Sequence, residues 1–110
     1  SVTTKLITKY LKDSNVIIDT VELGSDALDK IRNHEKYDLI LLEEDLKPLD
    51  AYTIIKKLNQ IKNFNIKVVL LTKNTSLEYN ETYKDQGFTN VLVKPIDKEK
   101  LINVINGKDE

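Results

Sequence analysis

The sequence contains no cysteine and only three glycines and two prolines among its 110 residues. Without cysteine the chain can form neither a disulfide framework nor a thiolate metal site, which agrees with a reducing compartment. The three glycines are scattered, so a GxGxxG loop and a P-loop are both absent. This argues against a nucleotide-binding enzyme, and the missing phosphate loop also disfavours a small flavin-binding domain.

The chain also lacks an excess of charge of either sign, and it lacks long apolar runs. The chain has 17 basic and 18 acidic residues, so no overall field steers it to nucleic acid or to an anionic membrane. No apolar run approaches the roughly 20 residues that span a bilayer, and SVTTKLITKY lacks the apolar block of a signal peptide. We therefore expect one domain over residues 1–110 in the cytoplasm, without membrane contact of its own, although its parent protein could be membrane-tethered.

Helical and extended apolar patterns alternate along the whole chain. Unbroken apolar strands argue for a parallel sheet with helices on both faces. Ser25 and Asp97 are expected to cap two of the helices, and Gly87 and Gly107 to end two. The predicted strands are 15–19, 38–42, 67–72 and 90–93, and the predicted helices begin near residues 2, 25, 51, 75 and 97.

Polar side chains follow three of these strands at their carboxyl ends. In an open parallel sheet those ends share one rim, where the working site lies. The sequence thus predicts an acidic stretch facing a hydroxyl and two ammonium groups. These rim residues are Glu43, Glu44 and Asp45, then Thr72 and Lys73, and finally Lys94.

Three stretches, YDLILLEEDLKPLDA, VVLLTKN and QGFTNVLVKPIDKEKL, resemble the receiver domain of two-component signalling. The resemblance covers residues 1–106 and is closest to receivers of hybrid sensor histidine kinases. It implies a CheY-like, flavodoxin-like doubly wound sheet and a phosphorelay role as a response regulator domain. It also implies an aspartate that accepts a phosphoryl group beside Mg²⁺. A cluster of cations and hydroxyl donors stabilises that phosphoryl group.

Carried over to this chain, the resemblance assigns the phosphate-binding hydroxyl to Thr72 and the salt-bridging amine to Lys94. Pro95 would follow a cis peptide bond. The phosphoacceptor position, however, holds Glu43. A glutamate is one methylene longer and already carries the charge that phosphorylation would add, so we expect this receiver not to take a phosphoryl group.

Further departures from the family pattern point the same way. The small residue expected after the hydroxyl is Lys73, whose ammonium could reach Glu43 and fill the space of a phosphodonor. The aromatic residue that moves on activation in many members is replaced by Val91. Ala51 stands where most members have glycine, and Pro48 comes one place late.

The chain starts with the residues that resemble the family's first helix. The central first strand and its acidic pair would therefore lie upstream of Ser1, or else the sheet closes around the vacancy with four strands. Without that pair Mg²⁺ would have Glu43 and one backbone carbonyl as protein ligands, so we expect no metal and no other cofactor.

The remaining acidic residues and the single histidine have simpler interpretations. We expect Glu44 and Asp45 to be solvated loop acids. A displaced phosphoacceptor at Asp45 or Asp50 is the alternative, which would make this a functional receiver. His34 is expected to be exposed near a helix end, and no Ser/His/Asp arrangement can be built on it, so we expect no enzyme.

The function predicted from the sequence is that of a pseudo-receiver acting as a protein-interaction module. Its partner would be a histidine kinase or another signalling protein, without direct nucleic-acid contact. Either Glu43 paired with Lys94 or Lys73 fixes an active-like state, or the domain is an inert scaffold. The face expected to meet the partner carries Tyr79, Tyr83, Asn90 and Lys98.

Overall fold

The computed structural model, which describes residues 1–108, is built on a three-stranded parallel sheet. Its strands are β1 (Leu39–Glu43), β2 (Lys67–Thr72) and β3 (Asn90–Val93), in the order β1-β2-β3. The register pairs Leu41 with Val69 and Leu71 with Leu92. The predicted α/β class with a parallel sheet is confirmed.

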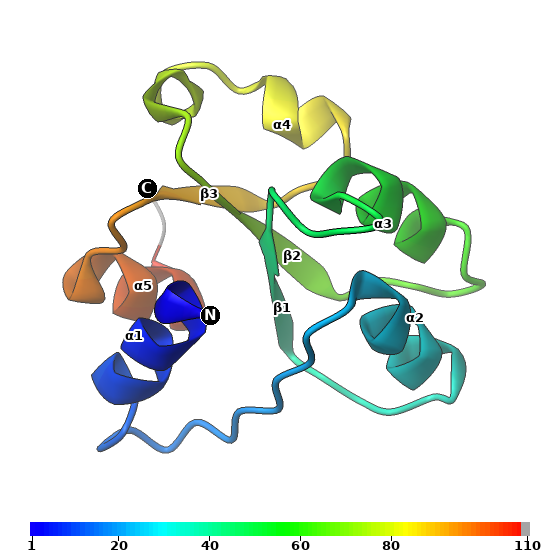
Figure 1. The fold of residues 1–110 in the computed structure, drawn as a ribbon, viewed down its shortest axis with the longest axis horizontal. Helices are drawn as coiled ribbons and strands as arrows, with labels where there is room; N and C mark the ends of the chain where they lie inside the picture. Colours follow the sequence, from blue (N-terminus) through cyan, green and yellow to red (C-terminus); the bar gives the residue numbers. More distant parts are fainter. Residues whose placement is uncertain (109–110) are drawn as a thin grey trace.

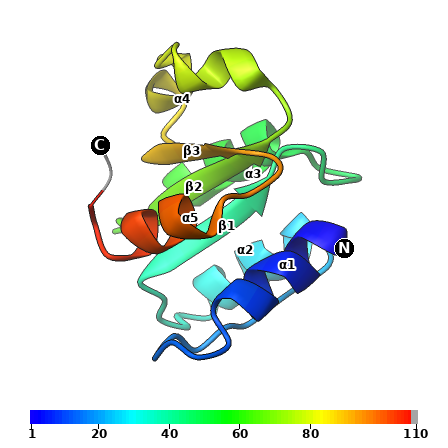
Figure 2. The ribbon, with the colours of Figure 1, turned by 90° about the vertical axis from the view of Figure 1, so that its left-hand side faces the viewer.

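Helices cover both faces of the sheet (Figure 1). Helices α1 (Val2–Tyr10) and α5 (Lys98–Ile105) lie on one face, and α2 (Gly24–Arg32) and α3 (Ala51–Asn59) lie on the other. Figure 2 shows the same layers after a quarter turn.

Alternate residues of β2 point to opposite faces, so this strand contributes to two separate hydrophobic clusters. Val68 and Leu70 pack with the α2 and α3 side, whereas Val69 and Leu71 pack with the α1 and α5 side. Burial on both faces explains why the strand is an unbroken apolar run.

Side-chain caps fix where several helices begin. Asp50 accepts a hydrogen bond from the Thr53 amide at the start of α3, and Asp97 does the same for Lys100 at the start of α5. Gly87 and Gly107 follow helix ends with positive φ angles of 106° and 76°. Three of these roles, those of Asp97, Gly87 and Gly107, are the ones predicted from the sequence.

The predicted strand at residues 15–19 is wrong. This segment is irregular, and the Ile17 side chain is 95% exposed. A strand needs a hydrogen-bonding neighbour, and within residues 1–108 no strand lies beside the outer edge of β1. Closure of the sheet with four strands is therefore also contradicted, and the end of the segment is held instead by a 2.7 Å hydrogen bond from the Tyr37 hydroxyl to Asp19.

Two helix predictions need correction. Helix α2 begins at Gly24 with Leu23 as N-cap, and no side chain caps it, so Ser25 does not have the predicted role. The predicted helix from residue 75 to 86 is divided into a 3₁₀ turn, η1 (Thr75–Glu78), and a short helix, α4 (Thr82–Asp85). The Asn80 side chain accepts from the Thr82 amide, a local bond that competes with a continuous helix.

Candidate functional site

The rim at the carboxyl ends of β1, β2 and β3 brings together the predicted acidic, hydroxyl and amine side chains. The strand ends are joined by backbone hydrogen bonds from the Lys94 amide to the Thr72 carbonyl (2.7 Å) and from the Glu44 amide to the Leu71 carbonyl (2.9 Å). Residues 50 apart in sequence are thereby held on one rigid edge.

Glu43 and Lys94 form the central ion pair of this rim. Lys94 Nζ lies 2.6 Å from Glu43 Oε1, and the two side chains are 17% and 23% exposed, respectively. The Ser1 hydroxyl donates to the other oxygen, Oε2, at 3.1 Å. Burial raises the pKa of the Glu43 carboxyl, but the hydrogen bond and charge of Lys94, together with the Ser1 hydroxyl and the N-terminal charge, outweigh it, so the pKa lies below its ordinary value.

Glu44 makes contacts at the rim that sequence reasoning missed. Its carboxylate accepts hydrogen bonds from the buried Thr72 hydroxyl and, at 2.5 Å, from the Tyr52 hydroxyl. Burial and the hydrogen bond to Glu44 raise the pKa of Tyr52 to about 12. Glu44 is half-buried and accepts from two hydroxyls, so the expectation of a solvated loop acid is wrong for this residue.

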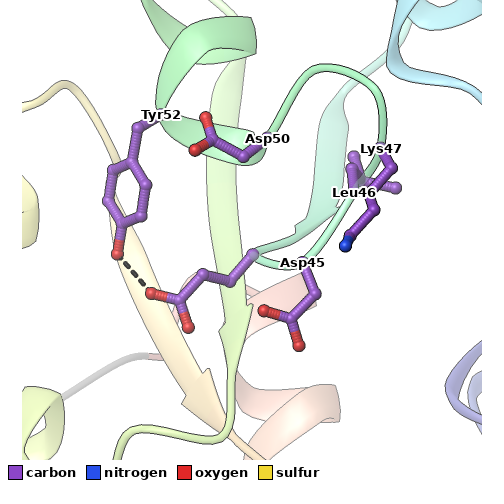
Figure 3. Close-up of a pocket in the computed structure, with 6 residues that line it drawn as sticks. Asp45, Leu46, Lys47, Asp50 and Tyr52 are labelled. Carbon is purple, nitrogen blue, oxygen red and sulfur yellow. Dashed lines mark hydrogen bonds between the residues drawn. The ribbon is translucent and has the colours of Figure 1, made fainter.

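Tyr52 is itself held by packing. Its ring lies edge-on to Phe88, with centroids 5.9 Å apart and planes at 89°. Figure 3 shows its hydroxyl directed at the carboxylate-bearing loop after β1. The one sequence signal for this contact was an aromatic hydroxyl in the first turn of the helix that follows the acidic loop.

Lys73 and the two alternative aspartates lie outside this network. Lys73 is exposed, and within residues 1–108 it forms no ion pair with Glu43 or any other acid. Asp50 caps α3, and the Thr53 amide holds the pKa of its carboxyl below the ordinary value. Asp45 is exposed on an open depression of about 600 Å³ (Figure 3), which is lined by Glu44, Asp45, Leu46, Lys47, Asp50 and Tyr52.

Of the remaining predicted positions, Pro95 lies next to the rim, Val91 lies within β3, and His34 lies before the amino end of β1. The Lys94–Pro95 peptide is cis, and so is Lys47–Pro48. Val91 pairs with Leu70 in the sheet and packs, partly buried, against the core on the α3 side. His34 is exposed just after α2.

Among the residues described, no group of three or more His, Cys, Asp or Glu side chains is arranged to hold a metal ion. Nor does any helix in residues 1–108 have the length and apolar character needed to cross a bilayer. The rim presents two adjacent carboxylates: Glu43 is paired with the Lys94 amine, and Glu44 accepts from the hydroxyls of Thr72 and Tyr52.

Comparison with known proteins assigns the chain that carries this rim to a family. The family model of the response regulator receiver domain matches residues 1–106. The Probable transcriptional regulator ycf29 of Porphyra purpurea is 30% identical over 106 residues, covering 96% of this chain and 50% of that protein. The sensor kinase/phosphatase LuxQ of Vibrio parahaemolyticus is 27% identical over 84 residues, 76% of this chain and 10% of its own length. The chain thus spans about half or less of these relatives.

Solved structures share the fold. The receiver domain of sensor histidine kinase PA1611 from Pseudomonas aeruginosa, determined with a magnesium ion in its active site cleft, superposes with a TM-score of 0.81 at 22% identity, covering 96% of this chain and 87% of that one. Chemotaxis response regulator CheY4 of Vibrio cholerae gives 0.82 at 23% identity, with coverage of 94% and 87%. With the family model matching nearly its whole length, this chain belongs to the response regulator receiver domains of two-component signalling.

Proposed function

We propose that this receiver domain does not accept a phosphoryl group and acts as a protein-interaction module of a two-component signalling protein. The observation that carries the proposal is the 2.6 Å ion pair between Glu43 and Lys94. By the family resemblance, Glu43 occupies the phosphoacceptor position and Lys94 supplies the amine that meets the phosphoryl group. The lysine is thus already neutralised by a side chain.

The neighbouring hydroxyl is engaged as well. Thr72 donates to Glu44, so the two groups that the resemblance assigns to phosphoryl binding each hold a carboxylate of the chain itself. An incoming phosphoryl group would have to displace both anions and would add negative charge beside them. This arrangement favours a permanently fixed, active-like state over an inert scaffold.

Metal binding follows the same reasoning. Mg²⁺ would have to compete with the Lys94 ammonium for Glu43 and with two hydroxyl donors for Glu44. We propose that residues 1–110, one receiver-like domain, bind no Mg²⁺ at this rim and catalyse no reaction. In a longer protein, a strand upstream of Ser1 ending in two acids would pair with the open edge of β1 and restore a metal site.

The proposed partner is a histidine kinase or another signalling protein in the cytoplasm, reached without nucleic-acid or membrane contact by this domain. The predicted face retains two accessible groups. Tyr79 is 88% exposed after η1, and Lys98 is exposed at the start of α5. Tyr83 packs partly against the core, so it contributes less to this face.

A working receiver that uses Asp45 or Asp50 is the second candidate, favoured by the open depression that both residues line. Intact mass after incubation with acetyl phosphate and Mg²⁺ separates the two functions. Our proposal predicts an unchanged mass for the wild type. A gain of one phosphoryl group, mapped by peptide analysis to Asp45 or Asp50, would establish the alternative instead.

A further inference from the structure

Glu44 lies at the start of a chain of hydrogen bonds that leaves the rim. Its carboxylate receives hydroxyls from two other elements, Thr72 at the end of β2 and Tyr52 in α3. A charged acceptor makes both hydrogen bonds stronger than a neutral one would. The Thr72 side chain is only 1% exposed, so water does not compete for its hydroxyl proton.

The same Thr72 oxygen also bonds to the segment that follows β2. It accepts a hydrogen bond of 3.0 Å from the Asn74 amide. The Asn74 side-chain oxygen in turn accepts from the Ser76 amide (3.1 Å) and the Ser76 hydroxyl (2.7 Å), which caps η1. The orientation of one hydroxyl thus links the acidic loop to the start of η1.

Beyond η1 the path reaches the proposed partner face. Glu78, the last residue of η1, pairs with Lys100 of α5 at 3.4 Å, and the exposed Tyr79 follows directly. The ion pair is largely solvated and contributes little by itself. Buried Leu77 anchors η1 in the core, and the Asn74 cap fixes how the turn starts after the buried end of β2.

We infer that Glu44 is a positioning residue. By orienting the Thr72 hydroxyl it fixes the start of η1, and with it the surface around Tyr79, without a transferred phosphoryl group. The regulatory meaning of this inference rests on the proposed function. Because Glu44 is part of the chain, residues 73–79 adopt this conformation, and form this surface, without phosphorylation.

Hydrogen exchange of backbone amides in the full chain, without phosphodonor, tests the inference. Glu44→Ala and Thr72→Val each remove one partner of the buried bond, and we expect exchange at Asn74 and Ser76 to accelerate about tenfold or more. Amides within β2 should keep their protection. Asp45→Ala, which removes an exposed neighbouring acid, should leave all these rates unchanged.

Conservative variants separate positioning from general destabilisation. Thr72→Ser retains the hydroxyl and should restore slow exchange at Asn74, whereas Thr72→Val should not. If Thr72→Val or Glu44→Ala also accelerates amide exchange within β2, the milder variants Glu44→Gln and Thr72→Ser are compared instead. Glu44→Gln should accelerate exchange at the Asn74 amide, and Thr72→Ser should not. Equal protection of Asn74 and Ser76 in wild type, Glu44→Gln and Glu44→Ala would overturn the inference. Because no phosphodonor is present, this failure is independent of the mass measurement.

Discussion

Lys94 reaches Glu43 across the sheet, since their strands, β3 and β1, are both neighbours of β2 and not of each other. The ion pair therefore links the two outer strands at their carboxyl ends. Its charges are built into the sequence, so its contribution is present in every molecule at neutral pH.

The ionised Glu43–Lys94 pair should make the stability of the domain depend on pH in the acid range. Because the folded pKa of Glu43 is lower than its ordinary value of 4.5, the ionised pair stabilises the fold fully above that value. This contribution is lost as pH falls below 4.5 and through the folded pKa. Urea unfolding at several pH values should show a shallower acid loss for Glu43→Gln than for the wild type. Parallel curves would contradict a depressed pKa.

Tyr52→Phe should destabilise the domain while leaving its ring packing on Phe88 intact. The change removes one hydroxyl from Glu44, and we expect a loss of about 1 kcal/mol in the free energy of unfolding. Tyr37→Phe is the matched control, because its hydroxyl also meets carboxylates but at the exposed surface. A smaller loss for the control, measured by urea titration, supports the buried network; equal losses would refute it.

Gly87→Ala should cost more stability than Gly107→Ala. Both glycines have positive φ, so both substitutions carry backbone strain of about 1 kcal/mol. Only at Gly87 would the new Cβ also lie 2.5 Å from the Asn59 side chain, whereas Gly107 has open space. Thermal unfolding of the two variants measures the difference. A midpoint for Gly87→Ala at or above that of Gly107→Ala would contradict the packing described here.

Local patterns predicted the parts of the fold that local physics determines. The runs at 39–42 and 68–71 are apolar on both faces because helices cover both sides of the sheet. Asp97 and Gly107 mark helix ends through bonds made within a few residues. The segment at 15–19 has the same apolar character, yet a strand also needs a partner, and residue type carries no information about that.

The candidate site divides in the same manner. Strand ends of a parallel sheet had to meet at one rim, so proximity among Glu43, Thr72 and Lys94 followed from topology. Which carboxylate met which donor did not follow. Glu43 ends β1 and Glu44 follows it directly, yet their partners come from the turn after β3, from the end of β2 and from α3. Neighbouring identical residues thus acquired different surroundings that only the three-dimensional arrangement distinguishes.

Glu43 is the ionised partner of Lys94 at neutral pH. The most direct measurement is a site-resolved NMR titration of the Glu43 side-chain carboxyl carbon in the wild type and in Lys94→Met. We expect a wild-type pKa below 4.5 that rises in the variant, because burial then acts without the compensating ammonium. Identical pKa values in the two proteins, or a wild-type value at or above 4.5, would contradict it.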